Sequence, residues 1–402
     1  MSGVTADQTA THIAMSPRRI LAIMLIIATG VLAALQLAKI APLVGWYQQE
    51  IGLSLVAIGW LTALIGIFIA LVALPTGWVI DRIGTITSVR LGAITLAAGA
   101  FGLALSREPA LIFTFRLIEA LGYLALCVGL PALLNELSPA RWKGPVLAVW
   151  SGFVPLGFAV SDLLARTWLV LTSSQDFLMA AALLLAATAL VSDRVCAGLE
   201  RLSAKRTPAS LWHGVSAPVM LLALAFCVFV ILSISFFAFL PNYLQTASGR
   251  VLLVSAGAIA LLVPLGNLLA GMLVAGRSVR TMVILGTLGF LLSAASAWLV
   301  FAGLFAPVAT MAAAVYAISG AVVASILFAV IPYLVAPSGS VPMAMGLVAQ
   351  GGGIGTVIGP PVSAAVIENF GYAGFGLMLS ALAMSGFAIL LPLVTTRRHV
   401  AT

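Results

Sequence analysis

Twelve long apolar runs succeed one another along this chain of 402 residues, and each is long enough to cross a lipid bilayer. A spanning helix needs about 20 predominantly apolar residues. The runs are continuous and do not alternate apolar with polar residues, so they predict helices and not the strands of a membrane barrel. The expected fold is an all-α integral membrane protein with twelve transmembrane helices, at about 20–44, 53–80, 88–106, 110–134, 145–168, 175–193, 217–244, 251–274, 281–303, 307–333, 341–367 and 372–394.

The composition indicates that lipid is the main solvent of this chain. Only 7% of the residues are charged and 62% are hydrophobic, whereas a soluble domain has about 25% charged residues. The net charge of +8 does not indicate nucleic-acid binding, because the basic residues are spread among short loops. The cysteines Cys127, Cys196 and Cys227 have neither disulfide nor metal-site spacing, so we expect no metal and no cofactor.

One polar segment divides the chain into two halves. We expect an N-terminal tail at 1–19, six helices at 20–193, a linker at 194–216, six helices at 217–394 and a tail at 395–402. With a cytoplasmic N-terminus, fourteen Lys and Arg residues fall on the inner side and two, Arg107 and Arg250, on the outer side, which predicts two cytoplasmic termini. The fourteen are Arg18, Arg19, Arg82, Arg90, Arg141, Lys143, Arg194, Arg201, Lys205, Arg206, Arg277, Arg280, Arg397 and Arg398.

An acid and a base stand side by side between the second and third runs, in the segment Gly77-Trp78-Val79-Ile80-Asp81-Arg82-Ile83-Gly84. A Gly-x-x-x-Asp-Arg-x-Gly turn at this place resembles the signature of the major facilitator superfamily, a large group of membrane transporters. The resemblance implies two parallel six-helix bundles. It also implies a cytoplasmic gate, for which the candidate residues are Gly77, Asp81, Arg82, Gly84 and Arg90.

In that family the acid of the turn is thought to brace the gate against the start of the eleventh helix. Asp81 would then face the positive N-terminal end of a helix that begins near Val341. The family usually has basic residues directly after the second glycine, but Thr85, Ile86 and Thr87 stand there in this chain. We therefore expect a weakened latch.

Two further motifs are similar to those of the family. Arg116, Glu119 and Gly122 resemble its fourth-helix motif, with the glycine displaced. The family's Gly-Pro pattern, associated with exporters, is poorly matched around Pro155 in the fifth run. It is better matched in the eleventh run by Gly355, Gly359 and Pro360. Small residues in membrane helices allow close packing, and use as a hinge during transport is the alternative.

Ionisable residues inside the runs are the main candidates for function, because charges in a bilayer are costly. Up-and-down topology places Lys39, Arg116, Glu119 and Asp162 at a similar depth in the outer half of the first bundle. Helical spacing puts Arg116, Glu119 and Tyr123 on one face. Gln36 shares a face with Lys39, and Arg166 with Asp162.

These charges have two interpretations. They can be ion pairs that only tie helices together. Alternatively, Lys39 and Arg116 attract an anionic substrate while Glu119 or Asp162 carries a proton, since a buried carboxylate responds to its neighbours. The second half has no charge inside its helices before Glu368. Its polar candidates for the pathway are Asn242, Tyr243 and Gln350.

The sequence therefore predicts a secondary transporter of the inner membrane that works by alternating access. No Gly-x-x-x-x-Gly-Lys-Ser/Thr segment marks an ATPase, and no catalytic cluster marks an enzyme. We expect a monomer in the bilayer that takes up a small, organic anion with protons, as a symporter. Its size and short loops are weakly similar to cyanate-type permeases. Proton-driven export of drug-like apolar or cationic compounds, and a non-transporting sensor or assembly protein, are the alternatives.

Overall fold

The computed structural model describes residues 15–197, 199, 216–246, 252–335 and 339–394, and these residues form helices joined by short turns. The N-terminal half comprises α1 (Pro17–Ala38), the short 3-10 helix η1 (Ala41–Leu43), α2 (Val44–Gln49), α3 (Leu55–Ile83), α4 (Thr85–Leu105), α5 (Pro109–Leu137), α6 (Ala140–Trp150), α7 (Phe153–Trp168) and α8 (Ser174–Cys196). The C-terminal half comprises α9 (Ala217–Thr246), α10 (Ala256–Ala260), α11 (Leu262–Val274), α12 (Val279–Phe301), α13 (Ala306–Leu334) and α14 (Val341–Val394).

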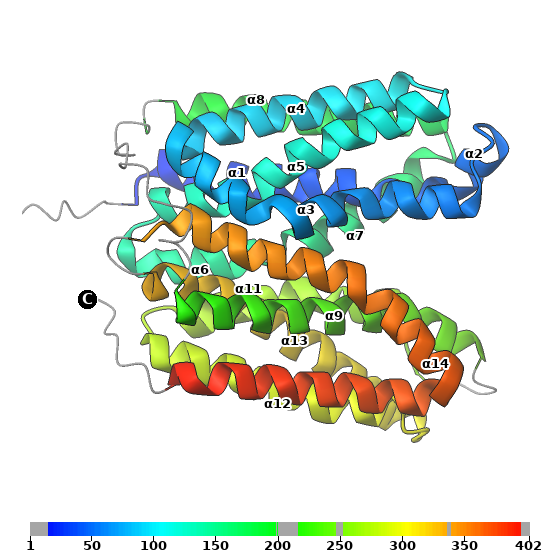
Figure 1. Cartoon of the computed structure of the whole chain (residues 1–402), viewed down its shortest axis with the longest axis vertical. Coiled ribbons are helices and arrows are strands. Elements are labelled where there is room, and N and C mark those ends of the chain that lie inside the picture. Colours follow the sequence, from blue (N-terminus) through cyan, green and yellow to red (C-terminus); the bar gives the residue numbers. More distant parts are fainter. Residues whose placement is uncertain (1–14, 198, 200–215, 247–251, 336–338, 395–402) are drawn as a thin grey trace, which may run out of the picture.

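The described residues contain 10 helices that are long and apolar enough to span a membrane, or 11 if the bent pair α6 and α7 counts as one span. The longest of them, α14, has 54 residues and a non-helical residue at Gly371. A straight helix of that length would be about 81 Å long, well over twice the hydrocarbon core of about 30 Å. In Figure 1 the orange and red parts of α14 meet at the right-hand end and diverge toward the left.

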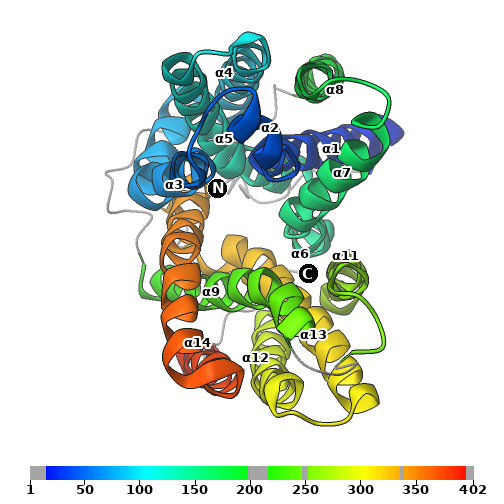
Figure 2. The ribbon, with the colours of Figure 1, turned by 90° about the vertical axis from the view of Figure 1, so that its right-hand side faces the viewer.

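The helices lie roughly parallel to one another and form two groups (Figures 1 and 2). Within the N-terminal half, α4 packs on α5, and α1 packs on α7 and α8. Within the C-terminal half, α14 packs on α9 and α12, and α12 on α13. The halves meet along two seams, one between α3 and α14 and the other between α6 and the pair α11 and α13.

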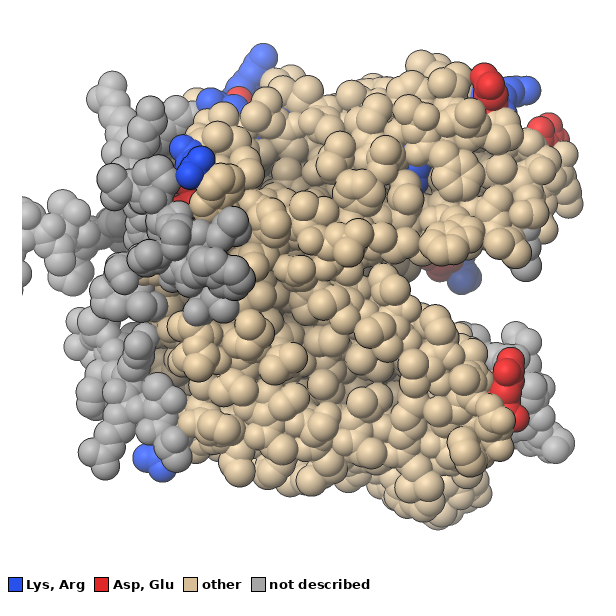
Figure 3. Space-filling model, in the orientation of Figure 1, with Lys and Arg blue, Asp and Glu red and all other residues tan. Residues whose placement is uncertain are grey.

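The two ends of the molecule differ. We call the end where α8 stops and α9 starts the linker end; it lies at the left in Figure 1. At the opposite end, where α2 and the bend of α14 lie, Figure 3 shows a cleft between the two halves. The structure is therefore open at this end, which we call the open end. At the linker end the halves touch, because a Cβ on Gly77 of α3 would lie 2.5 Å from Pro342 O of α14.

The reversal between α3 and α4 is a single residue, Gly84, which ends one helix and begins the next. Its φ of 89° and ψ of 148° lie in a region that is essentially restricted to glycine. The tight reversal expected at Gly84 is thus present. Asp81 and Arg82 lie in the last helical turn of α3 and not in the loop itself.

We expect Gly84→Ala to destabilise the protein by about 1–3 kcal/mol, because a Cβ is strained at this backbone conformation. Thermal unfolding of the purified protein in detergent measures the effect. Gly59→Ala is the matched control, since Gly59 lies inside α3 and a Cβ added there would meet nothing within 4 Å. A Gly84→Ala variant as stable as Gly59→Ala would contradict this assignment of strain.

Candidate functional site: a buried charge cluster in the N-terminal half

Three charged side chains meet inside the N-terminal half, and none has any exposed side-chain surface. Lys39 Nζ lies 2.6 Å from Glu119 Oε1, and Arg116 Nη1 lies 2.8 Å from Glu119 Oε2. Each of the three side chains is 0% exposed. Two cations therefore share one carboxylate, and the cluster carries one excess positive charge when all three groups are ionised.

Backbone carbonyls satisfy the remaining donors of Arg116. Its Nε donates to Leu61 O at 3.0 Å, its Nη1 to Gln36 O at 2.8 Å and its Nη2 to Leu37 O at 3.2 Å. The last two carbonyls belong to the final turn of α1, whose C-terminal end favours a nearby cation. Arg116 thereby joins α5 to α1 and α3.

Gln36 connects the cluster to a fourth helix. It accepts a hydrogen bond from Lys39 Nζ at 2.8 Å and donates one to Ala181 O of α8 at 2.8 Å. Gln36 and Lys39 stand three residues apart at the end of α1, where Lys39 is the C-cap, so both side chains point to the same neighbours. The cluster thus connects α1, α3, α5 and α8.

Close packing of α4 fixes the helix that carries the acid. A Cβ on Gly99 would lie 2.7 Å from Glu119 N and 2.8 Å from Glu119 Cγ. Only a residue without a side chain lets the two helices approach this closely. The position of Glu119 therefore depends on a glycine that the sequence patterns did not single out.

Two tyrosines lie near the cluster. Tyr47 of α2 is 0% exposed and interacts electrostatically with Arg116 and Glu119. Its hydroxyl has no hydrogen-bond partner among the described residues. Tyr123, which the helix spacing placed beside Glu119, is buried on α5, but no hydrogen bond within the described chain joins it to the cluster.

Asp162 does not belong to this cluster, although the topology put it at a similar depth. It pairs with Arg166 on α7 at 2.8 Å, and the two side chains are 60% and 77% exposed. This pair lies on the helix that faces α11 of the other half. The structure therefore separates the predicted charges into one buried group and one exposed pair.

Among the residues of the signature turn, Gly77 contacts the other half. A Cβ on Gly77 would lie 2.5 Å from Pro342 O, so α3 and the start of α14 touch backbone to backbone. Asp81 is half-buried, and no hydrogen bond or ion pair among the described residues joins it to α14. Ser340 instead caps that helix through Met343 N at 3.1 Å.

Both bases of the turn region have a partner in the N-terminal half. The Arg82 guanidinium lies 3.7 Å from the centre of the Trp78 ring, one helical turn away. Arg90 pairs with Asp193, which joins α4 to the end of α8. The expected brace between Asp81 and the eleventh helix therefore stays a prediction, and the contact that crosses the halves here is made by Gly77.

Of the predicted polar residues of the C-terminal half, no hydrogen bond given by the described part of the chain joins Tyr243 to Gln350. Tyr243 donates to Val300 O at 3.5 Å and packs against Phe301 and Tyr372. Gln350 is half-buried, and its Oε1 has no hydrogen-bond partner within the described residues. The side chain of Asn242 lies outside the described part of the structure.

The proline motif of the fifth run lies at a helix break, and the glycine motif of the eleventh run lies inside a continuous helix. Pro155 lies in the first turn of α7, four residues after Ser151, where α6 has ended. Gly355 and Gly359 face α9, because Cβ atoms there would approach Cys227 O at 2.7 Å and Ser235 Oγ at 3.2 Å. The helix continues through Pro360. The contacts of Gly355 and Gly359 with α9 therefore support close helix packing as the role of these glycines.

Comparison with known proteins agrees with this architecture. The family model described as Major Facilitator Superfamily matches residues 24–338, well over half of the chain. The chain belongs to the major facilitator superfamily. As a family member it is a multi-pass membrane transporter. No curated protein sequence matches it.

Three solved structures of the superfamily share the fold. The human organic anion transporter MFSD10 (TETRAN) is 19% identical with a TM-score of 0.73, over 94% of this chain and 100% of that one. The proton:xylose symporter XylE is 14% identical with a TM-score of 0.73, over 94% and 96% of the two chains. The transporter FucP, in its outward conformation, is 14% identical with a TM-score of 0.68, over 94% and 100%.

Proposed function

We propose that this protein is a secondary active transporter that carries a small organic anion together with protons across the inner membrane by alternating access. The buried cluster of Lys39, Arg116 and Glu119 is the observation that carries the proposal. Buried ion pairs contribute little net stability compared with apolar residues of similar volume. Charges retained inside a membrane domain are therefore best explained by transport.

The sign of the cluster favours an anion. Two bases face one acid, so opening the cluster to the cleft would expose an excess positive charge. In the C-terminal half, the crevice between α9 and α13 is lined by uncharged side chains, among them Phe229, Phe237 and Tyr316. MFSD10, whose fold this chain shares, is an organic anion transporter by its description.

A twelve-helix topology is part of the same proposal. The described residues give 11 membrane crossings if α6 and α7 form one span. If α14 divides at Gly371 into two spans, the number becomes twelve. An even number puts both termini on one side, which the basic residues indicate to be the cytoplasm. The cleft then opens outward, and we expect the transporter to work as a monomer.

Transport into proteoliposomes tests the proposal. With an acidic exterior, we expect a panel of small organic anions to include one that accumulates, and accumulation to stop when a protonophore removes the pH gradient. Movement of no anion, or export of a lipophilic cation instead, would overturn it.

Substitution of Lys39 tests the part played by the cluster. We expect Lys39→Gln to lower the uptake rate about tenfold or more, because one cation of a fully buried group is lost. Arg166→Gln is the matched control, since it removes a cation from an exposed pair. Equal uptake by the two variants would show that the buried cluster is structural.

A further inference from the structure

The seam between α6 and the C-terminal half contains a buried polar group that neither the signature turn nor the charge cluster accounts for. It lies where α6 ends at Trp150 and α7 starts at Phe153, with a bend of 42° between the two helices. Proline has no N–H, so Pro155 cannot donate to the carbonyl of Ser151, four residues earlier. The helix breaks at this point.

The break releases a backbone carbonyl. Gly152 N donates to Val149 O at 3.1 Å, which leaves Ala148 O without its usual partner four residues later. Ala148 is 0% exposed, and a buried carbonyl without a hydrogen bond is costly. Ser151 Oγ donates to Ala148 O at 2.7 Å, and so does Ser325 Oγ of α13, in the other half, at 3.1 Å.

Asn267 of α11 completes the group from the same half as Ser325. Its Nδ2 donates to Ser151 Oγ at 2.8 Å and to Ser325 Oγ at 3.0 Å, and the two serine oxygens are 2.9 Å apart. Asn267 is 3% exposed and Ser325 0%. We call Ala148 O, Ser151, Asn267 and Ser325 the helix-break cluster.

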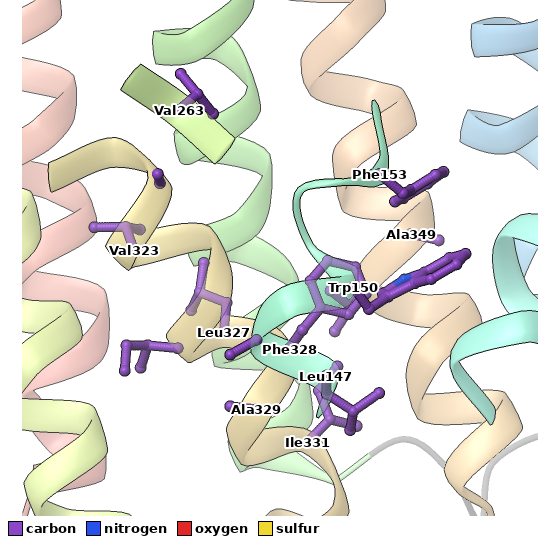
Figure 4. Packing of buried hydrophobic residues seen from close by; sticks show 14 of the residues in the cluster. Leu147, Trp150, Phe153, Val263, Val323, Leu327, Phe328, Ala329, Ile331 and Ala349 are labelled. Atoms are coloured by element: carbon purple, nitrogen blue, oxygen red, sulfur yellow. The ribbon is translucent and has the colours of Figure 1, made fainter. Parts of the chain in front are cut away.

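Gly152 packs closely against Asn267. A Cβ on Gly152 would lie 2.8 Å from Asn267 Oδ1. Around the cluster, Leu147 and Trp150 pack beside Phe328 and Ile331 of α13 (Figure 4). Ser151 is half-buried and Ala148, Asn267 and Ser325 are buried, so separating the halves would break the bonds that Ser325 Oγ and Asn267 Nδ2 make to α6.

The seam between α3 and α14 is held by a different kind of contact. Between α3 and α14 the described residues touch through glycines, and no hydrogen bond joins the two helices there. Separating the halves at that seam breaks van der Waals contacts alone. Separating them at α6 also leaves Ala148 O and Ser151 without their partners from the other half, at a desolvation cost until water enters.

We propose that the helix-break cluster is the polar latch that keeps the linker end closed, and that Asn267 and Ser325 set the balance between the two conformations of the transporter. The inference rests on the proposed alternating access. The proposed latch lies at the break between α6 and α7, in the fifth run, and not at Asp81. Inward opening requires these hydrogen bonds to exchange for bonds to water.

Distances between spin labels across the halves test the latch without a substrate. In a background without Cys127, Cys196 and Cys227, one label pair is placed at Glu50 and Glu368 of the open end. A second pair is placed at Arg82 and Arg280 of the linker end. Pulsed electron resonance in lipid nanodiscs gives the populations of open and closed distances at each end.

We expect Ser325→Ala to change the ratio of the two conformations about tenfold in favour of the one that is open at the linker end, because the hydrogen bond from Ser325 Oγ to Ala148 O across the halves is lost. Asn267→Ala is expected to act in the same direction. Ser293→Ala is the matched control: Ser293 is a buried serine of the same half whose 2.8 Å bond goes to Ser319 of that half.

Equal populations in Ser325→Ala and Ser293→Ala, whether both shift or both stay, would overturn the latch. A different result would contradict the transport proposal, namely that no anion moves in proteoliposomes. A shift in distances in a protein that moves no anion would therefore support the latch while contradicting the proposed substrate.

Discussion

Glu119→Ala is expected to lower the thermal midpoint of the protein by about 10 °C. The substitution leaves Lys39 and Arg116 fully buried beside each other without the carboxylate that they share. Removing one partner from a buried ion pair costs about 3–5 kcal/mol, because the remaining charge is uncompensated. Neither cation can reach water without unpacking α1 from α5.

The native cysteines provide the measurement. Cys196 is buried and Cys127 and Cys227 are half-buried, so a thiol-reactive dye reports unfolding as they become exposed. Glu119→Gln should lie between wild type and Glu119→Ala, because its amide oxygen still accepts a bond from Lys39. Asp162→Ala is the control from an exposed pair, with an expected cost of about 1 kcal/mol or less. A midpoint for Glu119→Ala as high as that of Asp162→Ala would refute the reasoning.

The apolar runs predicted most helices well because hydropathy marks the part of the chain that lipid must cover. The runs at 88–106 and 110–134 became α4 (Thr85–Leu105) and α5 (Pro109–Leu137), within about three residues. Interruptions inside a run were not predictable in the same way. In the first run the regular helix ends at Ala38, and the chain continues as η1 and α2. The hydropathy of the run does not indicate this change.

The charge cluster was partly predictable. Depth along the helices predicted that Lys39, Arg116 and Glu119 lie at one level of the bilayer. Helical spacing predicted that Arg116 and Glu119 share one helix face. Asp162 was expected at the same depth but is exposed, because Ser161 and Ala165 form the buried face of α7 instead. Depth alone does not determine on which side of a helix a residue lies when its neighbours are all apolar.

The helix-break cluster shows a second limit. Pro155 was a candidate hinge from its position, yet the consequence of the proline falls on Ala148 and Ser151 and is completed by residues more than a hundred positions away. Asn267 and Ser325 have no local pattern that links them to Ser151. Only the packing of the halves brings these residues together.

Gly346→Ala is expected to open the linker end without unfolding either half. A Cβ on Gly346 would lie 2.4 Å from Ala73 O of α3, across the seam between the halves. That oxygen belongs to a helix backbone and cannot rotate away as a side chain would, so α14 must move from α3. Overpacking of this kind costs about 1–3 kcal/mol, enough to reverse a balance between two conformations of similar free energy.

Gly351→Ala provides the comparison on the same helix. Its Cβ would lie 2.3 Å from Ala223 O of α9, a contact within the C-terminal half. The two variants therefore introduce similar overlaps that differ in whether they cross the seam. We expect Gly346→Ala to lengthen the distance between labels at Arg82 and Arg280 with little loss of thermal stability. Gly351→Ala should lower the thermal midpoint and leave that distance unchanged. The same response from both variants would mean that the seam between α3 and α14 is ordinary helix packing and takes no part in closing the linker end.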